Sequence, residues 1–125
     1  MEPANGRPPR RILVVDDNQD AADSLAMLMK LRGFEALVAY DGQTALRIAE
    51  SDKPSIVLLD IGLPGMDGCE VCRKMRERGL TDMRIIAMTG YGQESDRERS
   101  REAGFDVHAV KPVKIDDLLK LIEDA

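Results

Sequence analysis

The segment Ser55–Gly68 reads SIVLLDIGLPGMDG and contains a short apolar run that ends in a single carboxylate. Residues 56–59 lack the alternation of polar and apolar side chains that a half-exposed strand shows. We therefore expect a strand that is covered on both faces, as in a parallel sheet. Asp60 closes this strand, and a loop containing glycine and proline leads from it into a helix. Because open α/β sheets bind ligands at the carboxyl ends of their strands, the segment predicts a parallel sheet with Asp60 as its reactive group.

The rest of the chain repeats this order of a short apolar run followed by helical periodicity. The predicted strands cover residues 12–15, 34–39, 56–59, 84–88 and 107–110. Three predicted helices cover residues 20–32, 93–103 and 115–122, and two more begin at the caps Asp41 and Asp67 and end before Lys53 and at Arg78. Such an alternation requires parallel pairing, right-handed crossovers and helices on both faces of the sheet. The sequence therefore predicts a three-layer α/β domain.

Two of the predicted helices carry expectations of their own. The apolar positions of helix 20–32 that are predicted to face the sheet are Ala21, Leu25, Leu28 and Met29. Helix 93–103 is highly charged and has almost no apolar stripe. We therefore expect it to be mobile.

The composition is that of one globular domain. The chain has 125 residues, of which 43% are hydrophobic, which is enough for a single core. Its net charge of -5 argues against nucleic-acid binding, which needs a concentrated basic face. No apolar run approaches the ~20 residues that cross a bilayer, and the N-terminus lacks an apolar stretch of the signal-peptide type. We therefore expect a cytoplasmic protein without membrane insertion, with a flexible tail or linker at residues 1–9 and one domain at residues 10–125.

Cys69 and Cys72 form a C-x-x-C sequence, which has two interpretations. The first is a redox pair or half of a zinc site, but the chain has no second pair of thiols, and its one histidine cannot complete a zinc site. In the second, Val71, Cys72 and Met75 form the buried stripe of the helix that follows Asp67, and the thiols behave as small hydrophobic groups. The second interpretation is favoured.

The residues that follow the predicted strands form a candidate site. They are Asp16 and Asp17 after the first strand, Asp60 after the third, Thr89 after the fourth and Lys111 after the fifth. We expect them to meet, because the carboxyl ends of parallel strands share one edge of the sheet. Three carboxylates raise one another's pKa values unless a cation lies between them, and oxygen ligands without histidine suit Mg²⁺. A cation held by carboxylates, with an ammonium and a hydroxyl group opposite, forms a receptacle for a phosphoryl group.

These residues and their neighbours resemble the receiver (response-regulator, CheY-like) domain of two-component phosphorelay signalling. The matching features are Asp16-Asp17, Asp60 followed by LPGMDG at residues 63–68, Thr89-Gly90 and Lys111-Pro112. They occur in the order and at the spacing of the family, and the resemblance covers about residues 10–125. It implies a flavodoxin-like (βα)5 fold with a parallel sheet in the strand order 2-1-3-4-5.

The resemblance implies that the protein is a phosphorylation-controlled signalling switch and not an enzyme. Asp60 would accept a phosphoryl group from a phosphohistidine of a histidine kinase or a histidine phosphotransfer protein and form an acyl phosphate. Any catalysis would be limited to its own phosphotransfer and autodephosphorylation. Asp17 and the backbone carbonyl of Gly62 would bind Mg²⁺ or Mn²⁺ together with Asp60, and Asp16 would hold a water that is bound to the metal.

The resemblance also implies how the switch works. Lys111 and Thr89 would contact the phosphoryl oxygens, and the Lys111–Pro112 bond would be cis. Phosphorylation adds about two negative charges beside Thr89, whose hydroxyl moves toward them in the family. An aromatic side chain of the fifth strand then turns inward. His108 occupies that position here, where tyrosine or phenylalanine is commoner, and we expect its rotamer to report the state of the protein.

The expected output surface is the face that family members commonly use for partners or dimers, formed by the fourth helix, the fifth strand and the fifth helix. Residues 90–106 are similar to receivers fused to hybrid histidine kinases, and the proline-rich residues 1–9 fit the end of a linker. No DNA-binding segment follows, so we do not expect this chain alone to act as a transcription factor.

Two other classes of function remain open. A Mg²⁺-dependent phosphohydrolase of the haloacid dehalogenase type also forms an aspartyl phosphate, but such enzymes carry D-x-D on the first strand, whereas Asp16 and Asp17 are adjacent. A receiver that acts only as an interaction module would normally have lost Asp60 or Lys111. Residues 90–95 nearly form G-x-G-x-x-G, but they lack the third glycine and follow the fourth strand. A loop that contacts the phosphoryl pocket is therefore favoured over a dinucleotide site.

Overall fold

Five parallel strands form the middle layer of the computed structural model, which describes residues 10–63, 65–90 and 101–123. The strands are β1 (Arg11–Val15), β2 (Glu35–Ala39), β3 (Ile56–Asp60), β4 (Arg84–Thr89) and β5 (Val107–Val110). They lie in the order β2-β1-β3-β4-β5, and each neighbouring pair is parallel. The predicted flavodoxin-like sheet and its strand order are therefore confirmed.

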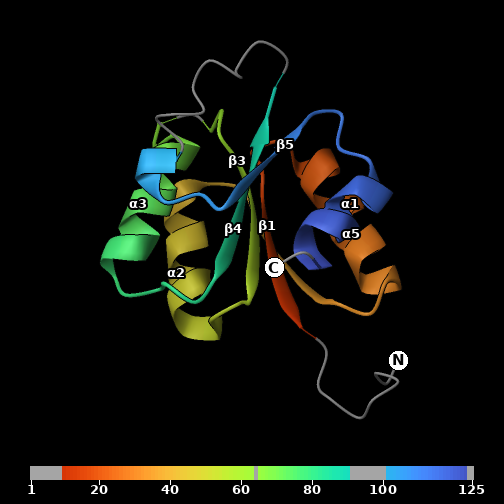
Figure 1. The fold of residues 1–125 in the computed structure, drawn as a ribbon, viewed down its shortest axis with the longest axis horizontal. Helices are drawn as coiled ribbons and strands as arrows, with labels where there is room; N and C mark the ends of the chain where they lie inside the picture. The colour runs from red at the N-terminus through yellow and green to blue at the C-terminus, as the bar shows by residue number, and fades with distance from the viewer. Residues whose placement is uncertain (1–9, 64, 91–100, 124–125) are drawn as a thin grey trace.

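Helices cover both faces of this sheet (Figure 1). The helices α1 (Gln19–Leu31) and α5 (Ile115–Glu123) lie on one side, and α2 (Gly42–Asp52) and α3 (Gly68–Glu77) lie on the other. Residues 101–103 are also helical, but the rest of the predicted helix 93–103 and the predicted tail at residues 1–9 lie outside the described residues. Each helix in the described part of the chain is too short or too polar to span a membrane.

Polar residues cap the amino ends of α1, α2 and α3. Asp41 Oδ1 accepts a hydrogen bond from the backbone N–H of Thr44 at 2.7 Å, and Asp67 Oδ1 accepts one from the N–H of Glu70 at 3.0 Å. Both predicted caps are thus confirmed. Asn18 caps α1 in the same way, although no cap was predicted there. Each cap satisfies a backbone donor that the helix leaves unpaired and contributes about 1 kcal/mol to stability.

Two separate clusters of buried apolar side chains fill the spaces between the sheet and its two helical layers. The central strand β3 is buried along its whole length, as predicted from its lack of alternation. Val57 and Leu59 belong to the cluster beneath α2 and α3, whereas Ile56 and Leu58 belong to the cluster beneath α1 and α5. The strand that ends in Asp60 therefore packs into both cores, as its neighbours β1 and β4 also do.

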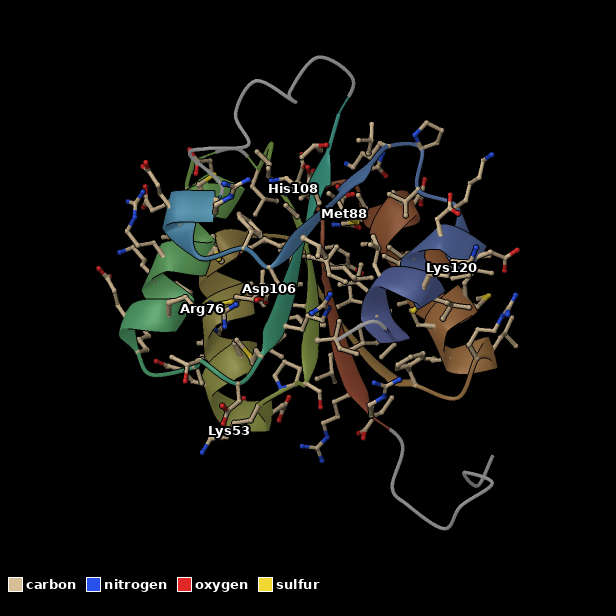
Figure 2. All side chains as sticks on the ribbon, in the orientation of Figure 1. Lys53, Arg76, Met88, Asp106, His108 and Lys120 are labelled. Carbon is tan, nitrogen blue, oxygen red and sulfur yellow. The ribbon has the colours of Figure 1, made fainter. Side chains whose placement is uncertain are left out.

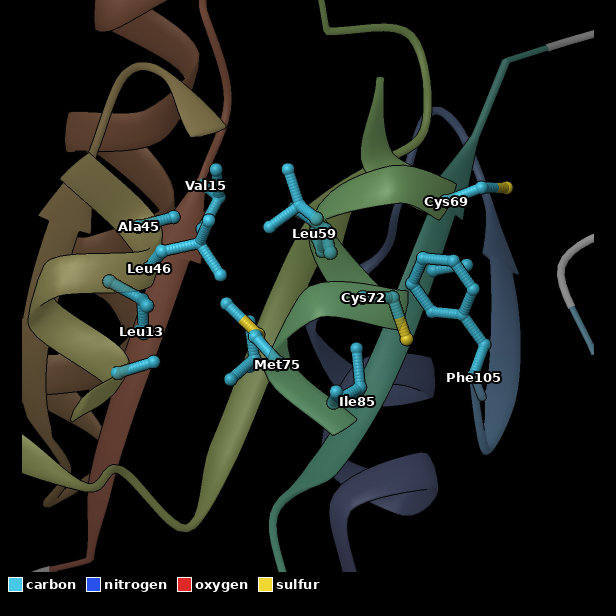
Figure 3. Packing of buried hydrophobic residues seen from close by; sticks show 14 of the residues in the cluster. Leu13, Val15, Ala45, Leu46, Leu59, Cys69, Cys72, Met75, Ile85 and Phe105 are labelled. Atoms are coloured by element: carbon cyan, nitrogen blue, oxygen red, sulfur yellow. The ribbon is translucent and has the colours of Figure 1, made fainter. Parts of the chain in front are cut away.

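The cluster on the α2 and α3 side contains both cysteines (Figure 3). Cys69 and Cys72 are fully buried and form no disulfide with each other, and Met75 and Phe105 belong to the same cluster. Burial raises the pKa of the Cys72 thiol to about 12, so this thiol is protonated and unreactive near neutral pH. These observations support the interpretation of the C-x-x-C sequence as part of a buried helical stripe.

The buried face of α1 differs from the predicted one. The structure buries Ala22, Ala26 and Met29 and leaves Ala21 and Leu28 exposed, so the prediction is wrong for the latter two. Met29 fits both patterns, because the two stripes overlap on the helix. The small side chains of Ala22 and Ala26 let α1 lie close to the sheet, and this close packing outweighs the larger apolar side chain of Leu28.

Replacing Met75 by alanine should lower the free energy of unfolding by about 2–5 kcal/mol, because it leaves a cavity in a fully buried part of the core. Met27 is a matched control, since it also lies in a helix but is 64% exposed. Met27→Ala should change the free energy of unfolding by less than about 0.5 kcal/mol. Urea unfolding measures both values, and similar losses in the two variants would contradict the described core.

Candidate functional site

Asp16, Asp17 and Asp60 converge at the carboxyl ends of β1 and β3. These two strands are neighbours, and their register pairs Val15 with Leu59, which brings the residues that follow to the same edge of the sheet. One carboxylate oxygen from each of the three aspartates lies within 4.8 Å of the others. Asp16 and Asp60 are buried, whereas Asp17 is exposed. The predicted meeting of the three acids is therefore present in the structure.

Backbone N–H groups orient the two buried carboxylates. Asp16 Oδ1 accepts a hydrogen bond from the N–H of Asn18 at 3.0 Å, and Asp60 Oδ1 accepts one from the N–H of Gly62 at 3.0 Å. In both cases the donor lies two residues after the acid, so the turn that follows each strand holds the carboxylate. The second oxygen of each carboxylate remains available for another partner.

Close packing of α3 against the end of β3 fixes the loop that follows Asp60. The N–H of Gly68 donates to the carbonyl of Ile61 at 3.0 Å. A Cβ atom on Gly68 would lie 2.5 Å from the carbonyl oxygen of Asp60 and 2.7 Å from the Cα atom of Ile61. Only glycine allows this approach, so the start of α3 lies directly beside the acid.

Lys111 brings an ammonium group to the second oxygens of both buried acids. Its Nζ atom lies 3.3 Å from Asp16 Oδ2 and 3.3 Å from Asp60 Oδ2. Its backbone N–H donates to the carbonyl of Thr89 at 2.7 Å, which ties the residue after β5 to the end of β4. The bond from Lys111 to Pro112 is cis, as the resemblance implied. The structure thus joins the ends of β1, β3 and β5 through a single side chain.

The site is short of positive charge. Burial raises the pKa of Asp60, although the N–H of Gly62 and the ammonium group of Lys111 act in the opposite direction. Burial alone would lower the pKa of Lys111, but the nearby carboxylates of Asp60 and Asp16 outweigh it, and this pKa is raised. Within the cluster one ammonium group faces three carboxylates. These oxygen donors fit a hard divalent cation such as Mg²⁺, which would compensate the remaining charge.

Thr89 and His108 lie on the same face of the sheet, one on β4 and the other on β5. The register pairs Thr89 with Val110 and Ala87 with His108, so Thr89 and His108 are diagonal neighbours. Thr89 is 1% exposed, and its Oγ1 atom has no hydrogen-bond partner within the part of the chain that the structure describes. A buried hydroxyl without a hydrogen-bond partner lowers the stability of the fold. Such a group is expected at a binding site, where a ligand supplies the missing partner.

His108 occupies the position of the predicted switch residue. It is half-buried, and its ring centroid lies 6.2 Å from that of Phe105, with an angle of 45° between the ring planes. Phe105 belongs to the cluster beneath α2 and α3, so His108 faces the same side of the sheet as that cluster. The structure therefore places the ring next to the core, while a switching role for His108 stays a prediction.

The structure brings most of the predicted site residues to one edge of the sheet. Asp16, Asp17, Asp60 and Lys111 form one cluster, Thr89 ends the neighbouring strand, Gly62 follows Asp60, and His108 lies further back on β5. The roles of these residues remain predictions. Asn18 orients Asp16 and caps α1, and neither role was predicted from the sequence. Its signal was an asparagine placed directly between a strand end and a helix.

Comparison with known proteins identifies the class. The family model of the response regulator receiver domain matches residues 12–123, and the chain belongs to this family. Receiver domains are phosphoacceptor signalling switches of two-component systems, and they bind Mg²⁺ at an acidic pocket. The acidic cluster formed by Asp16, Asp17 and Asp60 lies where such a pocket is expected.

Solved structures of similar fold include several response regulators. A CheY-like receiver domain protein from Methanospirillum hungatei is 33% identical with a TM-score of 0.86, and the match covers 93% of this chain and 92% of that chain. A DNA-binding response regulator of the LuxR family from Staphylococcus aureus is 27% identical with a TM-score of 0.83, covering 92% of this chain and 97% of that chain.

A third similar structure, a response regulator from Burkholderia pseudomallei, is 27% identical with a TM-score of 0.81. The match covers 88% of this chain and 64% of that chain. That protein was solved with a phosphorylated aspartic acid, a calcium ion and citrate.

Replacing Asp60 by asparagine should raise the free energy of unfolding at pH 7. Because the pKa of Asp60 is raised in the folded protein, its stabilising contribution is complete below the ordinary pKa of 3.8 and is lost as the pH rises through the folded-state value. Asparagine resembles the neutral acid and avoids this loss. Urea unfolding at several pH values should show that the gain over the wild type shrinks as the pH falls from 7 toward 3.8.

Asp41→Asn is the matched control, and its free energy of unfolding at pH 7 should change in the opposite direction. Hydrogen bonds from Thr44 lower the pKa of Asp41, so the ionised side chain stabilises the fold above its ordinary pKa of 3.8, and this contribution is lost as the pH falls. Asp41→Asn should therefore lower the free energy of unfolding at pH 7. A loss of stability in both variants would contradict the described environment of Asp60.

Proposed function

We propose that this protein is a switch in which Asp60 accepts a phosphoryl group from a phosphohistidine of a histidine kinase or a histidine phosphotransfer protein. One observation carries the proposal: the Nζ atom of Lys111 lies 3.3 Å from the carboxylates of both Asp16 and Asp60, which end two different strands. This contact creates a small polar site with an ammonium group on one side and an acidic cluster on the other. A phosphoryl group bound to Asp60 would lie between them.

The proposed reaction exchanges one bond for another. A carboxylate oxygen of Asp60 attacks the phosphorus atom while the bond between phosphorus and the imidazole nitrogen of the donor breaks. The electron pair of that bond remains on the imidazole, and Asp60 becomes an acyl phosphate. No proton has to move, so the protein contributes mainly positioning and charge neutralisation. Lys111 neutralises the phosphoryl oxygens, and the buried hydroxyl of Thr89 donates to one of them.

The proposed metal ligands are Asp17, Asp60 and the backbone carbonyl of Gly62, with Asp16 acting through a water. All of them are oxygen donors, which Mg²⁺ and Mn²⁺ prefer. A bound divalent cation supplies neutralisation of the charge on the transferred group. The phosphorylated aspartic acid and the calcium ion in the similar Burkholderia pseudomallei protein support this arrangement.

The proposed output surface is formed by β5, α5 and the predicted fourth helix at residues 93–103, most of which lies outside the described residues. His108 lies on β5 and on the same face of the sheet as Thr89, so a movement of the Thr89 hydroxyl toward the phosphoryl group would change the space around the His108 ring. A partner protein or a second copy of the chain would bind this surface with a different affinity after the change. The acidic net charge supports a protein partner over nucleic acid, and a cytoplasmic protein remains the expectation.

The proposed function makes the protein a phosphoacceptor and not an enzyme that turns over a separate substrate. A phosphohydrolase would use its aspartyl phosphate many times, and an interaction module would not be phosphorylated at all. The origin of the chain in a hybrid histidine kinase remains a prediction from residues 90–106 and is independent of the chemistry at Asp60.

Incubation with acetyl phosphate and Mg²⁺ tests the proposal. The wild-type protein should take up about one phosphoryl group per molecule, since a single carboxylate is the acceptor. Asp60→Asn should take up none, and removal of Mg²⁺ with EDTA should abolish uptake by the wild type. Intact-protein mass spectrometry measures the phosphorylated fraction, and Asp41→Asn, which changes an exposed cap, should behave like the wild type.

The alternatives give different results in the same assay. Release of many equivalents of phosphate per molecule would indicate a phosphohydrolase, and no uptake by the wild type would indicate an interaction module. Retention of the phosphoryl group by Asp60→Asn would place the acceptor at another residue. Each of these results contradicts the proposed function.

The switching role of His108 can be tested with beryllofluoride, which mimics a phosphoryl group on an aspartate. The ring signals of His108 in NMR spectra should differ between the Mg²⁺ form and the Mg²⁺–beryllofluoride complex, because the ring is expected to change its rotamer. Asp60→Asn, treated in the same way, should show no such change. Identical ring signals in the two wild-type forms would contradict a role for His108 in the switch.

A further inference from the structure

Arg76 connects three separate segments of the chain through one guanidinium group. Figure 2 shows its side chain reaching from α3 toward Asp106, which lies just before β5. Its Nη1 atom donates to the carbonyl oxygens of Leu80 at 2.9 Å, Thr81 at 3.3 Å and Met83 at 2.7 Å. These contacts hold the loop between α3 and β4, and they occupy one side of the guanidinium fork.

The other side of the same group holds the turn that leads into β5. Arg76 donates to the carbonyl of Gly104 from Nε at 3.1 Å and from Nη2 at 2.9 Å, and Nη2 also lies 2.9 Å from Asp106 Oδ2. Asp106 is itself tied to β4, because the N–H of Ile85 donates to Asp106 Oδ2 at 2.8 Å and the N–H of Asp106 donates to the carbonyl of Ile85 at 2.9 Å. The Arg76 side chain is only 18% exposed, so its ion pair with Asp106 is partly desolvated.

Close packing reinforces this arrangement. Gly104 has a φ angle of +109°, and a Cβ atom there would lie 2.8 Å from Cγ of Arg76. Ala103 and Phe105, on either side of it, are buried in the cluster beneath α2 and α3. The segment 103–106 is therefore fixed to α3 by Arg76 from one side and by the core from the other.

The position of the strand β5 depends on contacts at its two ends. It has four residues, lies at the edge of the sheet and pairs with β4 alone among the described strands. Its carboxyl end is held by Lys111, whose N–H donates to Thr89 and whose ammonium group contacts the acidic cluster. Its amino end is held by the contacts of Asp106 with Arg76 and Ile85. An edge strand of this length has few other bonds that resist fraying.

We propose that Arg76 is a positioning residue for phosphoryl transfer, which acts by anchoring the amino end of β5 and thereby fixing Lys111 at the other end. This inference rests on the proposed function, because it takes Lys111 as the group that neutralises the phosphoryl oxygens. Loss of the anchor leaves the Asp106 carboxylate without its cation and lets β5 move relative to β4. A displacement of about 1 Å at a reacting group can slow a reaction by as much as ~10²-fold.

The experiment compares Arg76→Met, Asp106→Asn and Arg78→Met with the wild type. Arg78 is the matched control, since it lies next to α3 and pairs with Glu50 at 3.0 Å, but it is exposed and does not contact the segment 103–106. The rate of phosphorylation by acetyl phosphate is measured by mass spectrometry. The dissociation constant of Mg²⁺ is measured by calorimetry, and both are measured below the melting temperature of each variant.

Arg76→Met should phosphorylate about tenfold more slowly than the wild type, while its dissociation constant for Mg²⁺ stays within about twofold. The phosphorylation rate should fall without a matching change in the dissociation constant of Mg²⁺. The reason is that the proposed metal ligands lie at the ends of β1 and β3, which pair with each other and not with β5. Asp106→Asn should have a smaller effect, since an amide oxygen can still accept from Ile85. Arg78→Met should match the wild type.

Three results would overturn the inference. Phosphorylation of Arg76→Met at the wild-type rate would show that β5 needs no such anchor. Equal losses of phosphorylation and Mg²⁺ affinity would show general damage to the fold instead of displacement of Lys111. If Arg76→Met does not fold, Asp106→Asn decides in its place, and a rate equal to that of Arg78→Met would refute the inference. Failure of the wild type to accept phosphate is a separate result, which rejects the proposed function itself.

Discussion

Two buried carboxylates, Asp16 and Asp60, end adjacent parallel strands, and their mutual repulsion is the constraint around which the site is built. Lys111 relieves part of this repulsion with one ammonium group, 3.3 Å from each acid. The carbonyl of Thr89 holds the backbone of Lys111, so the end of β4 supports the contact. Because Asp17 adds a third carboxylate, the site keeps an excess of negative charge that suits a divalent cation.

The proposed metal site lies at the central strands of the sheet, and the residues proposed to respond to phosphorylation lie at its edge. The proposed metal ligands Asp17 and Asp60, and Asp16, which acts through a water, lie at the carboxyl ends of β1 and β3. Both strands have a neighbour on each side, which holds them in place. Lys111 and His108 belong to the edge strand β5 or follow it directly, where movement costs fewer hydrogen bonds. A rigid centre can keep the metal and the acceptor aligned, while a more adjustable edge responds to the added charge. The contacts of Arg76 with Gly104 and Asp106 hold the amino end of β5 and so limit that freedom.

Local patterns in the sequence were sufficient for the parts of the fold that depend on neighbouring residues. The unbroken apolar run before Asp60 indicated a strand buried on both faces, and Asp41 and Asp67 start helices where predicted. The strand order came from the resemblance to a family and not from periodicity. The convergence of acids and Lys111 was predictable, because parallel strands share an edge.

Other features depend on contacts between distant segments and left no local signal. The buried stripe of α1 uses Ala22 and Ala26 instead of Ala21 and Leu28, a choice that only close packing on the sheet decides. Arg76 looks like a surface residue in a charged helix, because its partners come from two other parts of the chain. Distances were likewise needed to see that Lys111 is shared between Asp16 and Asp60.

The most direct test of the central claim is a crystal structure of the protein grown with Mg²⁺ and beryllofluoride. We expect a beryllium atom bonded to a carboxylate oxygen of Asp60, a metal ion in contact with Asp17, and fluorine atoms facing Lys111 and Thr89. A beryllofluoride group bound to another residue, or a Lys111 side chain that remains paired with Asp16 and Asp60 and makes no contact with the group, would contradict it.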